Sequence, residues 1–442
     1  MSPFLVKTIQ LLLSLSILIV LHELGHFIPA KLFKTRVEKF FLFFDVKFAL
    51  FKKKIGDTVY GIGWLPLGGY VKISGMIDES MDTEQMAQEP KPWEFRSKPA
   101  WQRLIIMLGG VTVNLIVGFV IYMMILFVWG QEELKPEQMP HGFEVAEPMK
   151  QFGFRNGDQI LAVNGKELDN ALEFNRYLLV RDVSEVSVRH QDGMTETLKL
   201  PDTIGDFIFK SGLRIPFSPR RDAVLDSIFS GYPAETSGLQ KGDRIVAVNG
   251  KEVSFFDEIG ANLYKGPDPQ PSTLLYSRNG VIDTLKITPD AEGKLGINSM
   301  LFKEVNPNKL SFSLGEAITK GFSFGYWTLH DYVVQFKYIF TKQGATQVGG
   351  FGTIAKLFPS TWDWQGFWAS TALISIILAF MNILPIPALD GGHVAFLLYE
   401  IVTGRKPSDK FLEYAQMIGF FILIALLLFA NGNDIYRWLF DK

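Results

Sequence analysis

The chain contains no cysteine in 442 residues, which excludes disulfide bonds, thiolate metal ligands and a cysteine nucleophile. An excess of either charge is also missing: 44 basic residues stand against 46 acidic ones, which argues against general nucleic-acid binding. Apolar residues, by contrast, make up 48% of the chain, and the mean hydropathy is +0.15. A soluble chain with 20% charged residues normally has a negative mean hydropathy. The apolar excess must therefore be concentrated in membrane segments, and the length allows two to four domains.

Four stretches of about 20 residues with few or no charges account for this excess. They run from residue 7 to 31, from 104 to 130, from 364 to 389 and from 414 to 433. At about 1.5 Å per residue, each can cross roughly 30 Å of hydrocarbon as a helix. The first stretch has no small-residue cleavage site ahead of its histidines, so we interpret it as an uncleaved anchor rather than a signal peptide.

The basic residues predict how these stretches are oriented. Thirteen lysine and arginine residues lie in segment 31–103, which places that segment in the cytoplasm. Arg405, Lys406 and Lys410 place the loop between the third and fourth stretches on the same side. Four spans then put both termini and the long region 131–363 outside.

Region 131–363 is soluble in composition and contains a duplication. The string GFRNGDQILAVNGKE, which begins at Gly153, recurs 85 residues later as GLQKGDRIVAVNGKE from Gly238. Each copy reads as a Gly-Asp turn, a short buried strand and an Asn-Gly hairpin turn. Such strings resemble the core of PDZ domains, which predicts one domain at 131–215 and another at 216–300. PDZ-like folds capture peptides by strand addition, although two inert β-rich spacers fit the same pattern.

Residues 310–340 show helical periodicity but are too polar to span a membrane. They predict an amphipathic, interfacial stretch within a segment that we place at 301–363. Trp362, Trp364 and Trp368 then mark an aromatic belt at the outer end of the third stretch.

The first apolar stretch carries the motif His-Glu-Leu-Gly-His at its inner end. On a helix, His22 and His26 lie on one face, so that both imidazoles can bind a single Zn²⁺. Glu23 is held beside the metal, where it can take a proton from water. Such residues inside a span cost several kcal/mol unless they are compensated, which favours a functional role. The alternative is that the two histidines only form hydrogen bonds with another helix.

Catalytic zinc sites usually have three protein ligands and one open position. The best third candidate is Asp390, because the predicted topology puts the inner end of the third stretch at the depth of the two histidines. Pro385 and Pro387 would break the helix just before it. A helix-capping role remains the alternative for Asp390, and His393, closer to the interface, ranks behind it as a ligand.

Together these motifs resemble the site-2 protease family of intramembrane zinc metalloproteases, in particular the bacterial RseP type with tandem PDZ domains. The HExxH motif, the PDZ pair and the later string NILPIPALDGG occur in the family's order over nearly the whole chain. The resemblance implies that His22, His26 and Asp390 bind one zinc ion and that Glu23 is the general base. It also implies that Asn382 helps to hold the substrate backbone.

Other parts of the chain fit the same family. The resemblance implies that Pro385 and Pro387 shape the substrate-binding segment. The string GIGWLPLGGYVK, which includes Gly68, Gly69 and Tyr70, resembles the stretch that follows a membrane-associated β-hairpin in these enzymes. Its alternating residues, at 55–75, could offer a strand edge to an extended substrate, while an ordinary surface hairpin is the alternative.

The second apolar stretch contains a string that resembles the family pattern A-G-P-x-x-N. Gly109 and Val111 stand where the family usually has alanine and proline, and Asn114 matches the asparagine. Asn114 either supports the active site or makes an interhelical hydrogen bond of about 1 kcal/mol.

The sequence therefore predicts a polytopic α-helical membrane protein with four transmembrane helices, whose membrane domain is divided between 1–130 and 364–442. A membrane-associated β-hairpin and two extracytoplasmic PDZ-like domains complete the predicted fold. The resemblance implies a zinc metalloendopeptidase of the bacterial inner membrane that cleaves single-span proteins, such as anti-sigma factors and signal-peptide remnants, in regulated intramembrane proteolysis. The PDZ pair would exclude substrates with bulky external domains, and its grooves could bind peptides.

Two functions of other classes compete with this interpretation. A zinc transporter would also place histidine and carboxylate groups inside the membrane. The sequence, however, shows one metal-binding cluster and no inverted repeat. A catalytically silent scaffold would use the PDZ domains alone, but the intact HExxH motif argues against it.

Overall fold

The computed structural model describes residues 2–66, 68–76, 89–168, 170–213, 215–264, 266, 268–302 and 305–440. The chain forms two compact units. The first combines Met1–Gly130 with Ser311–Lys442, and the second is Gln131–Leu310. A duplicated soluble segment is thus inserted into a membrane unit whose two parts are far apart in the sequence.

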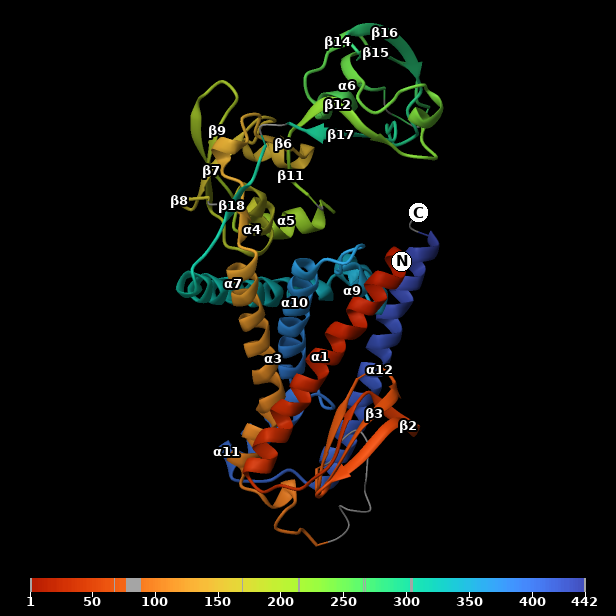
Figure 1. Ribbon diagram of the computed structural model, residues 1–442. Coiled ribbons are helices and arrows are strands. Elements are labelled where there is room, and N and C mark those ends of the chain that lie inside the picture. Colours follow the sequence, from red (N-terminus) through yellow and green to blue (C-terminus); the bar gives the residue numbers. More distant parts are fainter. Residues whose placement is uncertain are drawn as a thin grey trace. The chain divides into compact units, whose positions relative to one another are not determined.

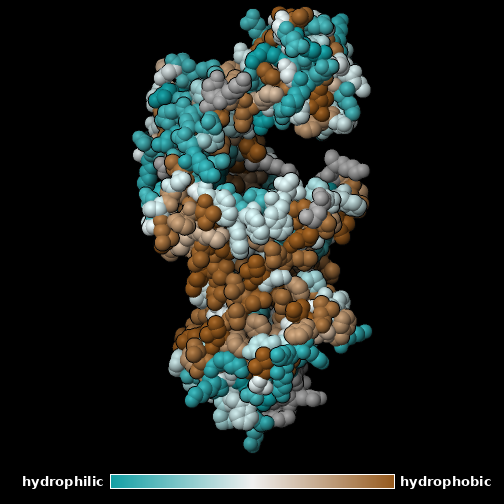
Figure 2. Space-filling view, in the orientation of Figure 1, coloured by the Kyte–Doolittle hydropathy of each residue, from teal (hydrophilic) through white to brown (hydrophobic). Residues whose placement is uncertain are grey.

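Among the described residues, four helices are long and apolar enough to cross a membrane (Figure 1). They are α1 (Pro3–Leu32), α3 (Ala100–Val128), α10 (Trp364–Ile383) and α12 (Asp409–Phe440). Figure 2 shows apolar side chains covering the middle of these helices, with polar side chains at the end that carries the sheet. The four predicted apolar helices are therefore confirmed.

The ends of these helices follow from local chemistry. The Ser2 side chain caps α1 by accepting from the backbone N–H of Leu5, and proline fits the first helical position. The third span ends at Ile383, although we expected it to reach residue 389. Pro385 has no N–H for a helical bond and disfavours helical geometry in the residue before it, so the helix stops there. A new helix, α11 (Asp390–Thr403), begins after the break.

Helix α3 is central to the membrane unit, where it packs against α1, α7, α10 and α11. It crosses α1 where Gly109 faces Gly25: a Cβ atom added to Gly25 would lie 2.4 Å from the carbonyl oxygen of Gly109. Side chains at either position would force the helices apart, so the two glycines permit the close crossing. Val111, which replaces the proline usual in the family pattern, lies within an unbroken α3.

The predicted helical segment after the soluble region forms α7 (Leu314–Phe336), α8 (Lys342–Gln347) and α9 (Phe351–Lys356). Ser313 and Glu316 form a capping box at the start of α7. Helix α7 runs across α3 and α10 in Figure 1 and packs on α3, where Gly321 adjoins Met123. We expected this segment to begin at residue 301, but residues up to Leu310 belong to the second unit.

A four-stranded sheet lies between α1 and α3 in the sequence. Its strands are β1 (Val37–Leu42), β2 (Phe44–Ile55), β3 (Thr58–Leu65) and β4 (Tyr70–Ile73), in the spatial order β2-β3-β1-β4. Strands β2 and β3 form an antiparallel hairpin. A hairpin at 55–75 would require β3 to pair with β4, but in the described sheet β1 lies between these two strands. Strands β3 and β4 flank β1, which carries the buried Val37 and Phe41. Leu67 lies outside the described residues, and β4 is an edge strand of the described sheet.

The second unit contains two β-rich domains, each with its own apolar core. The first comprises β6 (Phe143–Val145), β7 (Gln159–Val163), β8 (Lys166–Glu167), α4 (Phe174–Val180), β9 (Glu185–Arg189), β10 (Thr195–Lys199), α5 (Ile204–Lys210) and β11 (Phe217–Pro219). The second comprises β12 (Arg221–Ile228), β13 (Arg244–Val248), β14 (Lys251–Glu252), α6 (Phe256–Asn262), β15 (Ser272–Arg278), β16 (Val281–Ile287) and β17 (Ile297–Leu301). Strands β5 (Gln131–Glu133) and β18 (Asn308–Leu310) pair with each other and bring the two ends of the unit together.

The duplicated strings adopt matching structures in the two domains. In each, a short strand leads through an Asn-Gly turn into a second strand, giving the pairs β7–β8 and β13–β14. Asn164 and Gly165 have φ values of 50° and 73°, and Asn249 and Gly250 have values of 52° and 79°. Positive φ at both central residues is typical of the type I′ turn, which confirms the two hairpin turns predicted from the sequence.

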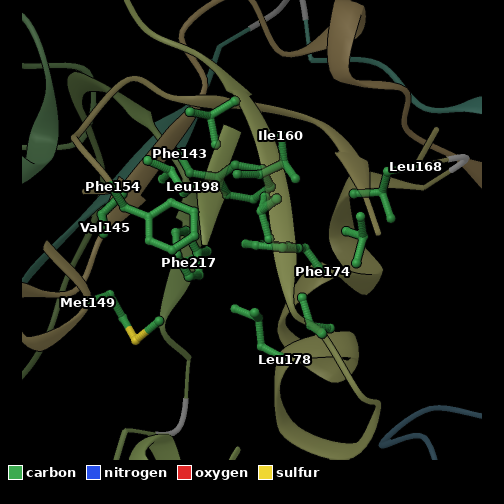
Figure 3. Close-up of a cluster of buried hydrophobic side chains, with 14 of the residues drawn as sticks. Phe143, Val145, Met149, Phe154, Ile160, Leu168, Phe174, Leu178, Leu198 and Phe217 are labelled. Carbon is green, nitrogen blue, oxygen red and sulfur yellow. The ribbon is translucent and has the colours of Figure 1, made fainter. Parts of the chain in front are cut away.

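The core of the first domain defines where that domain ends. Phe143, Phe154, Phe174 and Phe217 pack together in it (Figure 3), and burying each phenylalanine contributes roughly 1.5–3 kcal/mol. Strand β11, which carries Phe217, pairs with β6 of the same domain. The first domain therefore extends to Pro219, beyond the boundary at residue 215 that we expected.

The two domains bury equivalent aspartates against different cations. Asp158 lies 2.7 Å from Nδ1 of His190, while the guanidinium of Arg278 donates to Asp243 over 2.7 Å. Burial opposes protonation of His190, but hydrogen bonds to Asp158 and Glu196 outweigh it and raise the pKa of His190. Since arginine stays charged at all ordinary pH values, Asp158 is the one of these two aspartates whose cation titrates near neutral pH.

We expect the stability of the first domain to fall as the pH rises above about 6.5. The pKa of His190 is higher in the folded chain than in the unfolded chain, so protonated His190 stabilises the fold. This stabilisation is complete below the pKa of the unfolded chain and is lost as the pH rises through the pKa of the folded chain. Hydrogen exchange of the full chain between pH 6 and 9 should show falling protection factors in β7 and β9 but not in β13 and β15. His190→Gln should remove the difference, and equal slopes in both domains would contradict the prediction.

Candidate metal centre

Three side chains that are far apart in the sequence meet inside the membrane unit. Nε2 of His22 lies 3.3 Å from Nε2 of His26, and Oδ2 of Asp390 lies 3.3 Å and 3.4 Å from these two nitrogens. Within the described part of the chain, these are the histidine, aspartate and glutamate groups that cluster closely enough to hold one metal ion. The structure thus brings together the three residues that the sequence predicts as ligands.

Each of these side chains is placed by its own local structure. His22 and His26 are one turn apart on α1, so their imidazoles project from the same face. Asp390 is the first residue of α11 and follows the break that ends α10. Its carboxylate faces the two histidines, which a simple helix cap would not require.

The spacing of the three atoms matches a tetrahedral zinc site. Zinc bonds to nitrogen and oxygen of about 2.0–2.1 Å place neighbouring ligand atoms about 3.3–3.4 Å apart. Oδ2 of Asp390 is buried and has no hydrogen-bond partner among the described residues. A buried carboxylate oxygen without a donor is costly, and a metal ion would satisfy it. The donor set of two imidazoles and one carboxylate is also common for catalytic zinc.

The remaining ring nitrogens of the two histidines have partners on α3. Nδ1 of His26 donates to the carbonyl oxygen of Ile106 over 2.8 Å, which leaves Nε2 free to bind metal. Nδ2 of the Asn114 amide lies 3.1 Å from Nδ1 of His22. If Nε2 of His22 binds metal, its Nδ1 carries the proton, and the amide must be turned over so that Oδ1, which has no hydrogen-bond partner among the described residues, becomes the acceptor.

A cavity of about 420 Å³ opens beside these side chains. Of the residues predicted for the site, it is lined by His22, Glu23, His26, Gly69, Tyr70, Asn382 and Asp390. Pro385, Pro387 and Gly68 are not among its described lining residues. His393 lines the cavity but is not part of the three-residue cluster, so it keeps its lower rank as a ligand.

The edge strand β4 borders this cavity with Tyr70, Val71, Lys72 and Ile73. The Tyr70 hydroxyl donates to Asp45 over 2.7 Å and accepts from Lys39, while the Tyr70 ring stacks on Phe41. The chain that leads into β4 is also closely packed, because a Cβ atom added to Gly69 would lie 2.5 Å from Ile19 of α1. The strand is therefore packed beside Glu23, whose carboxylate accepts from the backbone N–H of Val71.

Sequence reasoning missed several residues around the cluster. Ala388 has a φ of 76°, and its N–H donates to Gln416 of α12 over 3.1 Å. A Cβ atom added to Gly110 would lie 2.3 Å from Nε2 of His26, so this glycine provides the space for the histidine ring. No pattern in the sequence marks Gln416 or Ala388, because the contact between them depends on how α12 packs against the broken segment.

The long apolar helices and the buried three-residue centre fit a membrane metalloprotease. The model of peptidase family M50 matches residues 10–426. This chain therefore belongs to peptidase family M50, and zinc is the metal that its relatives' names support.

Relatives from several bacteria align with nearly the whole chain. A protein of Neisseria meningitidis named "Putative zinc metalloprotease" is 28% identical over 96% of this chain and 97% of its own length. The "Regulator of sigma E protease" of Haemophilus influenzae is 27% identical over 96% of this chain and 98% of its own. The "Regulator of sigma-E protease RseP" of Salmonella typhimurium is 28% identical over 96% and 97%, respectively.

We expect Asn114→Leu to weaken zinc binding about 10- to 100-fold, since partners of metal-bound histidines typically have effects of this size. The substitution keeps the size of the side chain but removes the acceptor for Nδ1 of His22. Asn114→Asp, which keeps an acceptor oxygen, should bind zinc close to the wild-type affinity. Chelator competition on the purified chain measures both, and wild-type affinity in Asn114→Leu would show that the amide does not orient the histidine.

Proposed function

We propose that this chain hydrolyses peptide bonds within the transmembrane segments of single-span membrane proteins. The observation that carries the proposal is the triangle formed by His22, His26 and Asp390, with Glu23 beside it in a cavity bordered by an edge strand. A transporter site needs neither a neighbouring general base nor an edge strand, whereas a protease uses both.

In this proposal, His22, His26 and Asp390 hold one zinc ion per chain. When bound, zinc supplies a Lewis acid that polarises the scissile carbonyl and makes water more acidic. Glu23 accepts the proton from the attacking water and passes it to the nitrogen of the leaving amine. The carbon–nitrogen bond breaks as the new carbon–oxygen bond is completed, so that one water molecule is consumed for each peptide bond.

A transmembrane helix hides its carbonyl groups in internal hydrogen bonds, so the substrate must become extended before it can react. We propose that it adds as a strand to β4, the edge strand of the described sheet whose residues Tyr70 to Ile73 line the cavity. Asn382, at the last turn of α10, also lines the cavity and would bind the extended backbone. Pro385 and Pro387 would shape the segment between this residue and Asp390.

The distribution of charge supports an orientation with the metal centre near the cytoplasm. In the membrane unit, the sheet and α11 lie at one end of the helices and the two termini at the other (Figure 1). Lys52, Lys53 and Lys54 of β2 and Lys406 after α11 lie at the first end. By the positive-inside rule, that end is cytoplasmic, which puts the soluble unit in the periplasm of a Gram-negative inner membrane.

The sheet itself is suited to contact lipid. Phe48, Leu50 and Phe51 of β2 are more than half exposed, at 57%, 67% and 58%, and Trp64 of β3 stacks on Phe48. Apolar side chains exposed next to a lysine run are typical of a segment that lies in the membrane interface. We therefore propose that the β2–β3 hairpin is membrane-associated.

We further propose that the two β-rich domains are PDZ domains that select substrates. They would exclude proteins that still carry bulky external domains, so that this cleavage follows a prior cut. Anti-sigma factors and signal-peptide remnants are substrates of this kind, and their free ends could bind in the PDZ grooves. The names of the sigma-E protease relatives support this role in regulated intramembrane proteolysis.

Glu23→Gln should lower the cleavage rate by at least about 10²- to 10⁴-fold while zinc remains bound, because the amide cannot accept the proton. Cleavage of a model transmembrane substrate and the zinc content of the purified chain measure the two effects. Comparative membrane proteomics of the wild type and the variant should then show single-span proteins accumulating in the variant. A wild-type cleavage rate in Glu23→Gln would contradict the mechanism.

Deletion of residues 131–310 should permit cleavage of substrates whose external domain is still intact. The deletion is feasible because Gln131 and Leu310 are paired in the β5–β18 ladder, so the flanking ends can be joined by a short linker. The measurement compares the full chain with the deletion variant on one substrate, with and without its external domain. If the deletion variant rejects the substrate with its external domain as strongly as the full chain does, this unit does not exclude bulky substrates. As the control, both chains should cleave the trimmed substrate equally.

A further inference from the structure

Helix α12 has little buried surface, yet its buried residues gather at one place. They are Ala415, Gln416 and Gly419, whereas most of the apolar side chains that follow along the helix are exposed. At this place α12 lies directly against the segment between α10 and α11: a Cβ atom added to Gly419 would lie 1.7 Å from the carbonyl oxygen of Pro387. The buried part of α12 therefore contacts the segment that leads to Asp390.

That segment contains a backbone conformation that L-residues rarely adopt. Ala388, two residues before Asp390, has a φ of 76°, which is unfavourable for a residue with a Cβ atom. Such a conformation persists only where its surroundings hold it. At this point the N–H of Ala388 donates a hydrogen bond to Oε1 of Gln416 over 3.1 Å, and Gln416 is only 6% exposed.

A separate polar cluster fixes the far end of α12. Asp434 accepts from the backbone N–H groups of Gly350 and Thr353, each over 3.0 Å. Arg437 donates to the Thr353 hydroxyl over 3.0 Å and pairs with Asp434 over 2.7 Å. Because this cluster is remote along the helix from Gln416, it can hold α12 against the membrane unit without involving the metal centre.

We propose that Gln416 is a positioning residue for the metal centre. Its amide oxygen holds Ala388 in the strained conformation, and this places Oδ2 of Asp390 at the third corner of the triangle with His22 and His26. Helix α12 thereby acts as a fixed support for a ligand carried by an irregular segment. The inference rests on the proposed function, because it concerns the same zinc site.

The hydrogen bond can be separated from simple packing by choice of substitution. Gln416→Met keeps the length and volume of the side chain but removes the acceptor, so it should weaken zinc binding about 10- to 100-fold. Met417→Ala, at an exposed neighbouring position of α12, is the control and should leave zinc affinity unchanged. Chelator competition on the detergent-purified full chain gives the dissociation constants without relying on activity.

Two further variants test the role of the strained conformation. Glycine adopts a positive φ readily, so adding Ala388→Gly to Gln416→Met should recover most of the lost zinc affinity. Gly419→Ala should weaken zinc binding because its methyl group would displace Pro387, whereas Gly432→Ala in the same helix has open space and should have no effect. A loss of packing alone would not be rescued by glycine at position 388.

The kinetic readout distinguishes positioning from substrate binding. If zinc is supplied in excess, Gln416→Met should recover kcat, and KM should stay at the wild-type value throughout. Wild-type zinc affinity in both Gln416→Met and Gly419→Ala would overturn the inference, as would a failure of Ala388→Gly to rescue. A wild-type chain that binds no zinc, or a Glu23→Gln chain that cleaves normally, would instead overturn the proposed function.

Discussion

The burial of two imidazoles and a carboxylate among apolar helices is the constraint on which the membrane unit depends. Isolated polar and ionisable groups at this depth cost several kcal/mol each, so they must compensate one another or bind a metal ion. His22, His26 and Asp390 do this by converging within 3.3–3.4 Å, and the remaining ring nitrogens face Ile106 and Asn114 of α3. The neighbouring helices are arranged so that this convergence is possible.

Three local departures from regular helix packing permit it. Gly25 and Gly109 let α1 and α3 cross closely enough for the histidines to reach their partners on α3. Pro385 ends α10 and releases the irregular segment that carries Asp390 into the site. Helix α12, which is otherwise largely exposed, contacts that segment through Gln416. A cavity lined in part by the edge strand β4 is left beside the centre.

The second unit shows how duplication preserves a fold while its electrostatics diverge. Both domains keep the same Asn-Gly turns and the same buried aspartate, whose carboxylate accepts from the backbone N–H three residues earlier, that of Arg155 in one domain and of Gln240 in the other. The cation facing the aspartate is not constrained in the same way: it is His190 in one domain and Arg278 in the other. Equivalent folds therefore bury their aspartates against cations of different acidity.

The sequence by itself determined the four apolar helices, the Asn-Gly hairpins and the pairing of His22 with His26, because hydropathy, turn chemistry and helical periodicity are local properties. It also indicated Asp390, since topology and the positive-inside rule placed this residue at the right depth. Only the tertiary structure decided the separation of β3 from β4, the end of the soluble unit at Leu310 and the contact between Gln416 and Ala388. These depend on pairing and packing between segments far apart in the chain, which no local pattern specifies.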